Sequence, residues 1–182
     1  MGLKVGLLDE DDRRRYAGGR AFIGMRRSDR EIANIGVIKQ ILDNCKTCHL
    51  AMVDDGCPYV IPLSFAYIMA DGMLALFFHS AKEGRKIDVL RKNSTVCFEM
   101  CIEGEPVFAA ETPCNSGYYY SCVHGFGKAH FIDDVDEKCS ALSLLMKHQA
   151  GIDVAITPQQ AESVCVFKVV SSNFTCKVKQ RP

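Results

Sequence analysis

The segment Phe77–Ile87 (FFHSAKEGRKI) holds the residue types best suited to binding an anion. An apolar run ends in His79 and Ser80, and a short basic segment follows. The basic residues are Lys82, Arg85 and Lys86. Free N–H groups at a helix start, a serine hydroxyl and cationic side chains together replace the hydration of a phosphate. The pattern predicts a phosphate site at a strand-to-helix corner, and the alternative, favoured by composition alone, is a solvated basic helix with an ordinary N-cap.

A second candidate lies in Tyr59–Tyr67 (YVIPLSFAY), where Pro62 interrupts an otherwise strong strand pattern. Proline cannot donate to a strand ladder, so the backbone groups of its neighbours are available to a ligand. A flavin ring suits such a segment, because its edge requires several backbone donors and acceptors while its faces require apolar cover. A bulged edge strand without a ligand is an equally good interpretation.

The third candidate is Gly117–Phe131 (GYYYSCVHGFGKAHF), in which Gly125 and Gly127 fall inside a predicted strand. Glycine weakens a strand unless something approaches the backbone closely, so contact with a ligand or a partner is predicted here. The spacing is not a dinucleotide-binding fingerprint, because it lacks a third glycine and opens no helix. The three consecutive tyrosines before Ser121 are typical of core or interface positions rather than of catalytic acids.

The ten cysteines suggest metal or redox chemistry only weakly. Cys45 and Cys48, followed by His49, have the spacing of half a zinc site, but no second half is evident. Cys97 and Cys101 lie on one predicted strand, about 13 Å apart, too far to hold one ion. No metal site is therefore predicted, and the remaining cysteines are expected to be small buried hydrophobic residues.

Of the five histidines, only His79 lies within a candidate site. The other four have no companion spacing that suggests a ligand set, and surface or hydrogen-bonded core positions are expected for them. They are His49, His124, His130 and His148.

Composition limits the class of protein that these candidates belong to. The chain has 182 residues, of which 48% are hydrophobic, enough to bury one core without disulfides. Its 22 basic and 22 acidic residues cancel, so neither nucleic acid nor a membrane is an expected partner. Met1–Arg20 lacks the features of a secretory signal, so we expect reduced thiols and a cytoplasmic protein.

The elements that must position the candidates follow from the pattern of apolar residues. Residues 1–24 pair an acidic with an arginine run and are expected to be a flexible extension, leaving residues 25–182 as one domain. Ser28 and Glu31 have capping-box spacing, which predicts a helix from about Asp29 to about Asn44. Three strands joined by turns at Asp54–Gly56 and Asp71–Gly72 are expected next, as an antiparallel meander.

Further along the chain, Ser80 is a potential N-cap for a short helix that ends at Asn93. Strands are predicted over Thr95–Ile102 and about Tyr118–Ile132, and a helix over about Val135–Ala150 with Gly151 as its stop. A helical turn starting at Thr157 and two strands around the turn at residues 171–173 complete the chain. This order favours a mainly β (α+β) fold, an antiparallel barrel with peripheral helices, over a doubly wound sheet.

Taken together, these segments resemble nitroimidazole-resistance (Nim)-related proteins of the pyridoxamine 5′-phosphate oxidase-like split-barrel superfamily. The resemblance covers Met25 to about Lys177. It rests on the order and spacing of four segments, which read MRRSDREI, CHLAMVDDGCPYVIPLSFAY, FFHSAKEGRKIDVLRKNSTVCFE and YYYSCVHGFGKAHFIDDVDEKCSALSLLMKHQAG. The chain departs from the commoner family pattern in lacking the arginine that often precedes the Ser-Val pair.

The resemblance implies an antiparallel split β-barrel that binds FMN where two identical protomers meet. One group of residues would border the isoalloxazine ring and ribityl chain: Pro62, Leu63, Ser64 and Phe65. A second group would lie on the phosphate side: Phe78, His79, Ser80, Ala81 and Lys86. A third group would approach from either protomer: Tyr119, Ser121 and Val123. Gly125 and Gly127 would be small to admit this contact.

The leading functional hypothesis from the resemblance is a flavin-dependent reductase. FMN would take two electrons from a reduced donor and pass them to a small aromatic acceptor such as a nitroimidazole. No catalytic residue is assigned. A flavin-binding module without turnover, a pyridoxamine 5′-phosphate oxidase-like enzyme and a barrel without cofactor remain alternatives, as does haem bound through His79 or His124.

Overall fold

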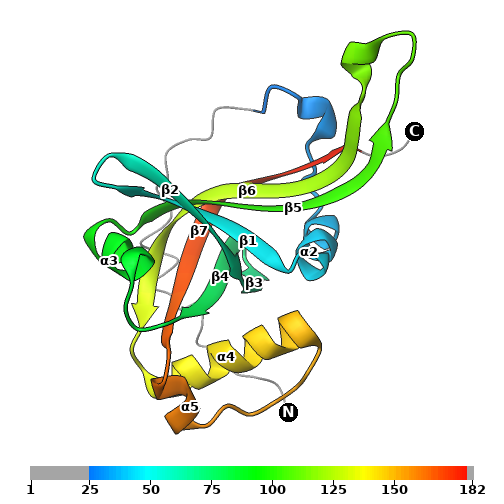
Figure 1. Ribbon diagram of the computed structural model, residues 1–182. Coiled ribbons are helices and arrows are strands. Elements are labelled where there is room, and N and C mark those ends of the chain that lie inside the picture. Colours follow the sequence, from blue (N-terminus) through cyan, green and yellow to red (C-terminus); the bar gives the residue numbers. More distant parts are fainter. Residues whose placement is uncertain (1–24, 180–182) are drawn as a thin grey trace.

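The computed structural model describes residues 25–179, so the predicted flexible extension over residues 1–24 lies outside the described part. Two short 3₁₀ turns, four helices and seven strands make up this part (Figure 1). The helical elements are η1 (Ser28–Arg30), α2 (Ile35–Asn44), α3 (Arg85–Lys92), η2 (Pro113–Asn115), α4 (Val135–Ala150) and α5 (Pro158–Glu162). The strands are β1 (Thr47–Asp54), β2 (Cys57–Ser64), β3 (Ala66–Ala70), β4 (Met73–Ser80), β5 (Thr95–Val107), β6 (Gly117–Ile132) and β7 (Cys165–Lys179).

All the strands form one antiparallel sheet in the order β2-β1-β5-β6-β7-β4-β3. β2 and β3 occupy opposite edges, although only Phe65 separates them in sequence. The sheet must therefore coil until its two edges meet, and no ladder joins β2 to β3 in the described part of the chain. The fold is an antiparallel split β-barrel, as predicted.

Phe65 corrects the predicted meander. The sequence pattern predicted one strand where the structure has β2 and β3, which pair with β1 and β4 respectively. Phe65 is fully buried between them, and its carbonyl accepts a hydrogen bond from Gln149 Nε2 (2.7 Å) instead of a ladder bond. An anchored side chain and a carbonyl satisfied by α4 allow the backbone to leave one edge and join the other.

The barrel interior is apolar because alternate residues of each strand point inward. On β1 the inward residues are Cys48, Leu50 and Met52, while Thr47, His49 and Val53 are exposed. Phe78 and Phe167 stack in this interior with ring centroids 5.1 Å apart.

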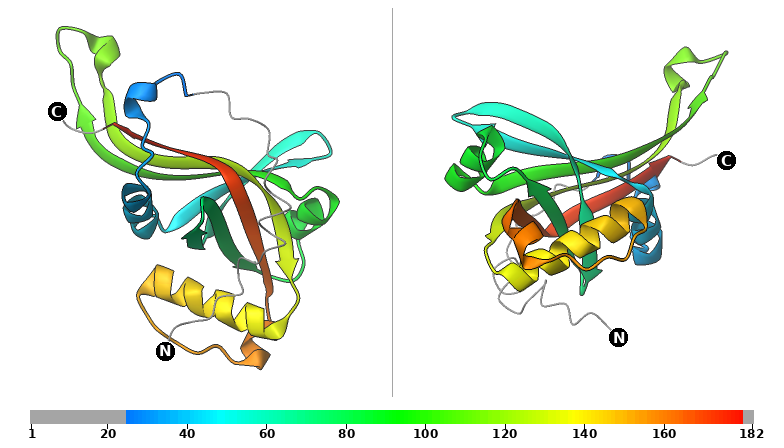
Figure 2. Two further views of the ribbon diagram at one scale, coloured as in Figure 1. Left: turned by 180° about the vertical axis from the view of Figure 1, so that it is seen from behind. Right: turned by 60° about the horizontal axis from the view of Figure 1, so that its bottom comes forward.

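β4 is buried on both faces, which explains its almost unbroken apolar sequence. Leu74, Leu76 and Phe78 belong to the barrel interior, whereas Met73, Ala75 and Phe77 belong to a second cluster that includes Ala141 of α4. α4 lies across the part of the sheet that contains β4 (Figures 1 and 2). Its predicted range is confirmed, and Gly151 ends it in the left-handed conformation with φ of 71°.

Two predicted helix starts are wrong. α2 begins at Ile35 rather than near Asp29, because Asn34 caps it by accepting a hydrogen bond from Val37 N (3.2 Å), and Ser28 lies in the separate turn η1. α3 begins at Arg85 rather than just after Ser80, because β4 continues through Ser80 and Gly84 takes the N-cap position with φ of 126°. In both cases the N-cap is the residue directly before the helix and not the serine that the sequence pattern suggested.

The predicted turn at residues 171–173 is also wrong, because β7 is one continuous strand. Ser171 Oγ donates a hydrogen bond to Phe126 O (2.6 Å) at the place where the β6–β7 register shifts. The local serine-rich sequence therefore marks a bulge between two long strands and not a reversal of the chain.

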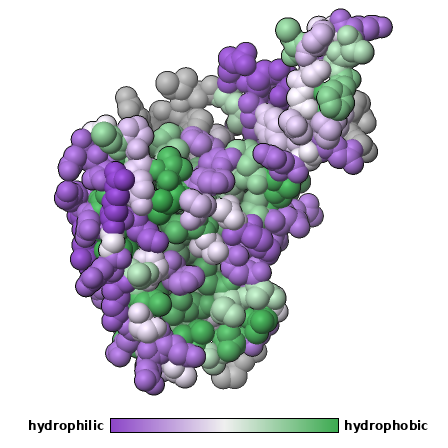
Figure 3. Space-filling view, viewed as in Figure 1, coloured by the Kyte–Doolittle hydropathy of each residue, from purple (hydrophilic) through white to green (hydrophobic). Residues whose placement is uncertain are grey.

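β5 and β6 continue beyond the barrel as a two-stranded arm with η2 near its tip (Figures 1 and 2). The sequence pattern predicted a shorter strand, ending at Ile102, whereas β5 reaches Val107. Phe108 and Tyr118 on this arm are 85% and 59% exposed. Hydrophobic and hydrophilic residues alternate over the arm in Figure 3. None of the helices in residues 25–179 has the length and apolar character needed to cross a membrane.

Candidate functional site

The strand-to-helix corner predicted from the sequence exists between β4 and α3. β4 ends at Ser80, residues 81–84 are exposed, and α3 starts at Arg85. No side chain caps this helix, since Gly84 is its N-cap, and the N–H groups of Arg85 and Lys86 form its open first turn. Such N–H groups and the positive end of the helix dipole favour an anion.

Arg85 connects this corner to the hairpin formed by β1 and β2. Its Nε lies 2.9 Å from Asp54 Oδ2, and its guanidinium carbon lies 4.4 Å from the centroid of the Tyr59 ring. The hydrogen bond to Asp54 raises the pKa of Arg85, which is therefore a fixed cation. The corner and β2 thus border one region of the surface.

Lys86 is the second residue of α3 and is half-buried at the corner. The other side of the corner is the end of β4, where Ser80 pairs with Cys165 of β7. Ser80 is buried and its hydroxyl donates to Ala81 O (2.7 Å), while His79 and Ala81 are exposed.

The predicted ring-binding segment lies on β2, an edge strand as the sequence suggested. Its pairing with β1 is regular, so the predicted alternative of a bulge is not observed. Pro62 and Ser64 are exposed on the outer face, and Leu63 points toward the barrel interior. The edge of this strand, with an exposed proline, can accept a flat ligand without losing ladder hydrogen bonds.

Three of the predicted site residues are core residues. Phe65, Phe78 and Val123 are fully buried in the barrel interior, so only their backbone groups are available to a ligand. Tyr119 and Ser121 are half-buried on β6. β6 lies three strands from β2, about 14 Å along the sheet, so the structure does not bring these residues together with Pro62 in one protomer.

Contact with a ligand or a partner was predicted to explain Gly125 and Gly127, and the structure gives a different reason. A Cβ at Gly125 would lie 2.5 Å from Phe98 Cζ and 2.8 Å from Asn173 O. A Cβ at Gly127 would lie 2.6 Å from Val170 O. Both glycines are required by internal packing of β6 against its neighbours, next to the shift in register.

Two of the pockets on the described surface are lined by none of the predicted site residues. The larger, of about 520 Å³, lies beside α2, β3 and α4, where Tyr67 donates to Asp43 Oδ1 (2.7 Å) and burial raises the pKa of Tyr67. The smaller, of about 370 Å³, is lined by Arg27, Asp29 and Arg30 together with residues of β7. Arg27 and Asp29 pair within it at 2.6 Å.

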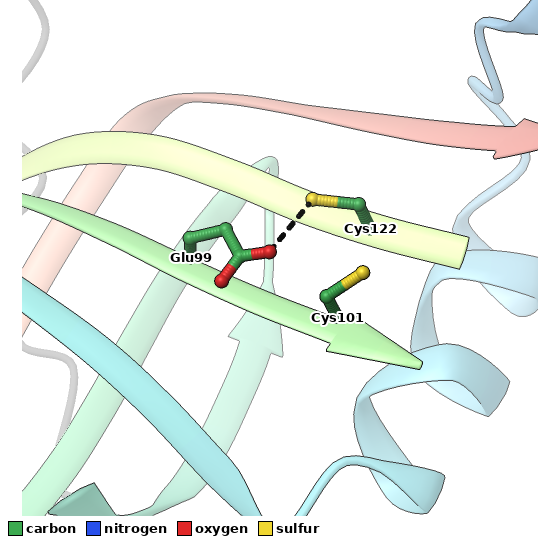
Figure 4. A group of neighbouring side chains, drawn as sticks. All are labelled: Glu99, Cys101 and Cys122. Atoms are coloured by element: carbon green, nitrogen blue, oxygen red, sulfur yellow. Dashed lines mark hydrogen bonds between the residues drawn. The ribbon is translucent and has the colours of Figure 1, made fainter. Parts of the chain in front are cut away.

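A group of ligand-type side chains that sequence reasoning missed lies on the outer face of the sheet. Glu99 and Cys101 of β5 and Cys122 of β6 place one ligand atom each within 4.8 Å of one another (Figure 4). We call these residues the Cys–Glu cluster. It depends on cross-strand pairing, which spacing along one strand does not reveal.

The surroundings of the Cys–Glu cluster keep its thiols protonated. Cys122 Sγ donates to Glu99 Oε1 (3.4 Å), and His49 Nδ1 lies 3.0 Å from Glu99 Oε2. Burial, followed by the charge of Glu99, raises the pKa values of Cys101 and Cys122. Beside the cluster, Cys97 Sγ lies 3.1 Å from His124 Nε2.

Cys45 and Cys48, the sequence candidates for half a zinc site, gather no ligand set in the part of the chain that the structure describes. Both are buried, and burial raises the pKa of Cys45 to about 11. Of the remaining cysteines, which were expected to be buried hydrophobic residues, Cys57 and Cys114 are exposed, which corrects that expectation.

Among the histidines expected at surface or hydrogen-bonded core positions, His148 is half-buried and hydrogen-bonded. Its Nε2 lies 2.9 Å from Cys45 O, and its ring packs 4.9 Å from that of Phe65. Burial lowers its pKa. His49 is exposed and His79 lies at the corner.

Comparison with known proteins identifies a family that matches this chain. A family profile described as pyridoxamine 5′-phosphate oxidase matches residues 36–174. No curated protein sequence matches the chain significantly.

Several solved structures are similar over most of their length. A Bacteroides thetaiotaomicron protein, provisionally named a 5-nitroimidazole antibiotic resistance protein, is 29% identical with a TM-score of 0.70, over 81% of this chain and 86% of that one. The flavocytochrome Anf3 of Azotobacter vinelandii is 20% identical with a TM-score of 0.72, over 87% and 73%. A FAD and haem binding protein of Mycobacterium smegmatis is 18% identical with a TM-score of 0.69, over 84% and 74%.

Proposed function

The chain belongs to the pyridoxamine 5′-phosphate oxidase family, and on this premise we propose that it binds FMN and reduces small aromatic acceptors. The observation that carries the proposal is the corner between β4 and α3, where an uncapped helix start and two basic residues adjoin the exposed edge strand β2. Both parts of an FMN molecule therefore have a fitting surface in one region.

The corner fits the phosphate. The N–H groups at the start of α3, with the side chains of Arg85 and Lys86, offer hydrogen bonds and positive charge to a dianion. Arg85 is already oriented by Asp54 and Tyr59, so little side-chain entropy is lost when it binds a ligand. His79 is exposed beside this site.

β2 fits the ring. From Tyr59, which lies under Arg85 on the inner side of the strand with Leu63, β2 runs along the free edge of the sheet to Pro62 and Ser64, which point to its outer face. The distance from Tyr59 to Pro62 is about 10 Å by strand rise. A ring lying along this edge would meet backbone groups and apolar side chains, as a flavin requires.

The second copy of the chain would complete the site. Tyr119, Ser121 and the backbone of the buried Val123 lie about 14 Å across the sheet from β2, so these parts of β6 would reach a ring on β2 only from the partner of a homodimer. The projecting arm, with Phe108 and Tyr118 exposed, is a further surface that association would bury.

FMN supplies reversible two-electron chemistry when bound. The residues of this chain would hold the phosphate at α3, orient the ring against β2 and exclude water from one ring face. A nitroaromatic acceptor is supported by the 29% identity to the Bacteroides protein. The cofactor would transfer the electrons, and the protein would position the cofactor and the acceptor.

An absorbance spectrum of the purified protein, with identification of the chromophore released by heat, tests FMN binding. Lys86→Ala and Arg85→Ala should each weaken FMN binding by about tenfold or more, because each removes a charge-assisted hydrogen bond. Lys92→Ala, at the far end of α3, should bind FMN like the wild type. A colourless protein that also does not bind added FMN would overturn the proposal.

Turnover is tested separately with the FMN-loaded protein, a reduced nicotinamide donor and a nitroimidazole. Consumption of the nitro compound in proportion to enzyme supports the reductase. Tight FMN binding without turnover of any donor and acceptor pair would leave a flavin-binding protein and remove the reductase activity.

A further inference from the structure

The Cys–Glu cluster is built from directly opposed residues of two central strands. Cys101 pairs with Cys122, and one row along, Glu99 pairs with His124 on one side and His49 on the other. Directly opposed residues in an antiparallel pair point to the same face. The rigid ladder therefore fixes two thiols and a carboxylate side by side without the help of a loop (Figure 4).

We propose that Cys101, Cys122 and Glu99 bind a borderline or soft divalent cation, with Zn²⁺ as the representative. Two sulfur ligands and one carboxylate favour this class of cation over Mg²⁺ or Ca²⁺, which prefer oxygen ligands alone. The three ligand atoms lie within 4.8 Å of one another, a separation that small rotations of the side chains bring to tetrahedral coordination.

His49 strengthens the site from outside. Its Nδ1 lies 3.0 Å from Glu99 Oε2, leaving the other carboxylate oxygen, Oε1, directed at the Cys122 thiol. A ligating carboxylate that is itself held by a hydrogen bond is typical of metal sites and usually improves affinity. A bound cation would replace two protons, the one that Cys122 donates to Glu99 and the one on the Cys101 thiol, and both would leave to solvent.

The three protein ligands leave one tetrahedral position for water or a small anion. Cys101 is exposed and the other two ligands are half-buried, so the cation has a path from solvent. Lys177, the register partner of Cys122 on β7, lies on the same face and opposes a cation, which limits the affinity expected. The site requires no flavin and is independent of the proposed reductase activity.

The test is a titration of the full, reduced chain with Cd²⁺. Binding is monitored by the charge-transfer absorption between thiolate and cadmium and, separately, by calorimetry. One equivalent per chain should bind. Cys122→Ser and Cys101→Ser should each weaken this binding at least about a hundredfold, because two thiolates are needed. Glu99→Gln should weaken it less, and His49→Ala about tenfold.

Cys114→Ser, an exposed cysteine on the arm, and Cys57→Ser, exposed on the β1–β2 hairpin, are the matched controls and should bind Cd²⁺ as the wild type does. Thermal unfolding without metal checks the fold of every variant. If Cys122→Ser proves unstable, Cys101→Ser provides the test, because Cys101 is exposed and its substitution should leave the fold intact. Equal binding by the Cys101→Ser variant and the wild type would overturn the proposal. So would a reduced protein that binds no Cd²⁺, or one in which Zn²⁺ fails to compete with Cd²⁺.

Discussion

The ladder formed by β1, β5 and β6 has one apolar face and one polar face. Its inner face carries Leu50, Phe98 and Val123, all fully buried. The neighbouring residues on its outer face are His49, Glu99 and His124, which form one row across the three strands. Alternation along each strand thus places these three polar side chains one residue away from a residue of the core.

The difference shows how the ladder separates the residues that stabilise the fold from those that carry polar groups. Each fully buried large apolar side chain contributes about 1.5–3 kcal/mol through its removal from water. The outer row contributes mainly exposed or half-exposed polar contacts, which are worth about 1 kcal/mol or less. Residues of the outer face are therefore free to vary in chemistry, whereas those of the inner face are fixed by shape.

The largest effect is expected from a pair of adjacent residues on opposite faces. Phe98→Ala should lower the free energy of unfolding by about 4 kcal/mol, because it leaves a cavity in the barrel interior. Cys97→Ala, one residue away on the outer face, should lower it by less than about 1 kcal/mol. Urea unfolding of both variants measures the contrast, and similar losses would contradict the division between the faces.

A smaller loss is expected where the inner face lacks room. Gly125→Ala places a Cβ 2.5 Å from Phe98 Cζ and 2.8 Å from Asn173 O, and should cost about 2–3 kcal/mol through overpacking. Phe126→Ala, the next residue and half-exposed on the outer face, is the control and should cost about 1 kcal/mol. A neutral Gly125→Ala would show that β6 and β7 separate easily at the bulge.

The sequence predicted those parts of the molecule that depend on local pattern. The alternation in β1, the apolar run of β4 and the capped helix α4 are all local, and each was located correctly. The corner between β4 and α3 was also found, because a strand end, a glycine and a basic helix start are adjacent in sequence.

The parts that could not be predicted depend on which strands pair. Phe65 separates two edge strands because Gln149, far away in sequence, satisfies its carbonyl. Cys101 and Cys122 are neighbours only through the β5–β6 register, and no spacing rule along the chain brings them together. Gly125 is small because of Phe98 on the next strand, and the sequence alone suggested a ligand instead.

Outside the ladder, His148 of α4, which is hydrogen-bonded to Cys45 O, predicts a dependence of stability on pH. Burial lowers its folded-state pKa below the ordinary 6.5, so the unfolded chain takes up the proton first. Its contribution to stability is complete above about pH 6.5 and declines as the pH falls toward the folded-state pKa.

The measurement is urea unfolding of the wild type and His148→Gln at about pH 7.5 and about pH 5.5. Glutamine keeps a donor for Cys45 O but does not titrate. The wild type should lose more stability than the variant between these two conditions. An equal loss in both proteins would mean that other groups carry the acid sensitivity.

The smallest effect is expected at the exposed C-terminal end of α4, where Lys147 Nζ and Asp153 Oδ1 are 2.9 Å apart with side chains 60% and 79% exposed. Asp153→Asn should change the free energy of unfolding by less than about 0.5 kcal/mol, because water and salt screen the pair. Thermal unfolding at low and high salt checks this. If the variant instead lost as much as Gly125→Ala, ion pairs outside the barrel would hold the fold as strongly as its interior, and the separation of stabilising residues from polar ones would not stand.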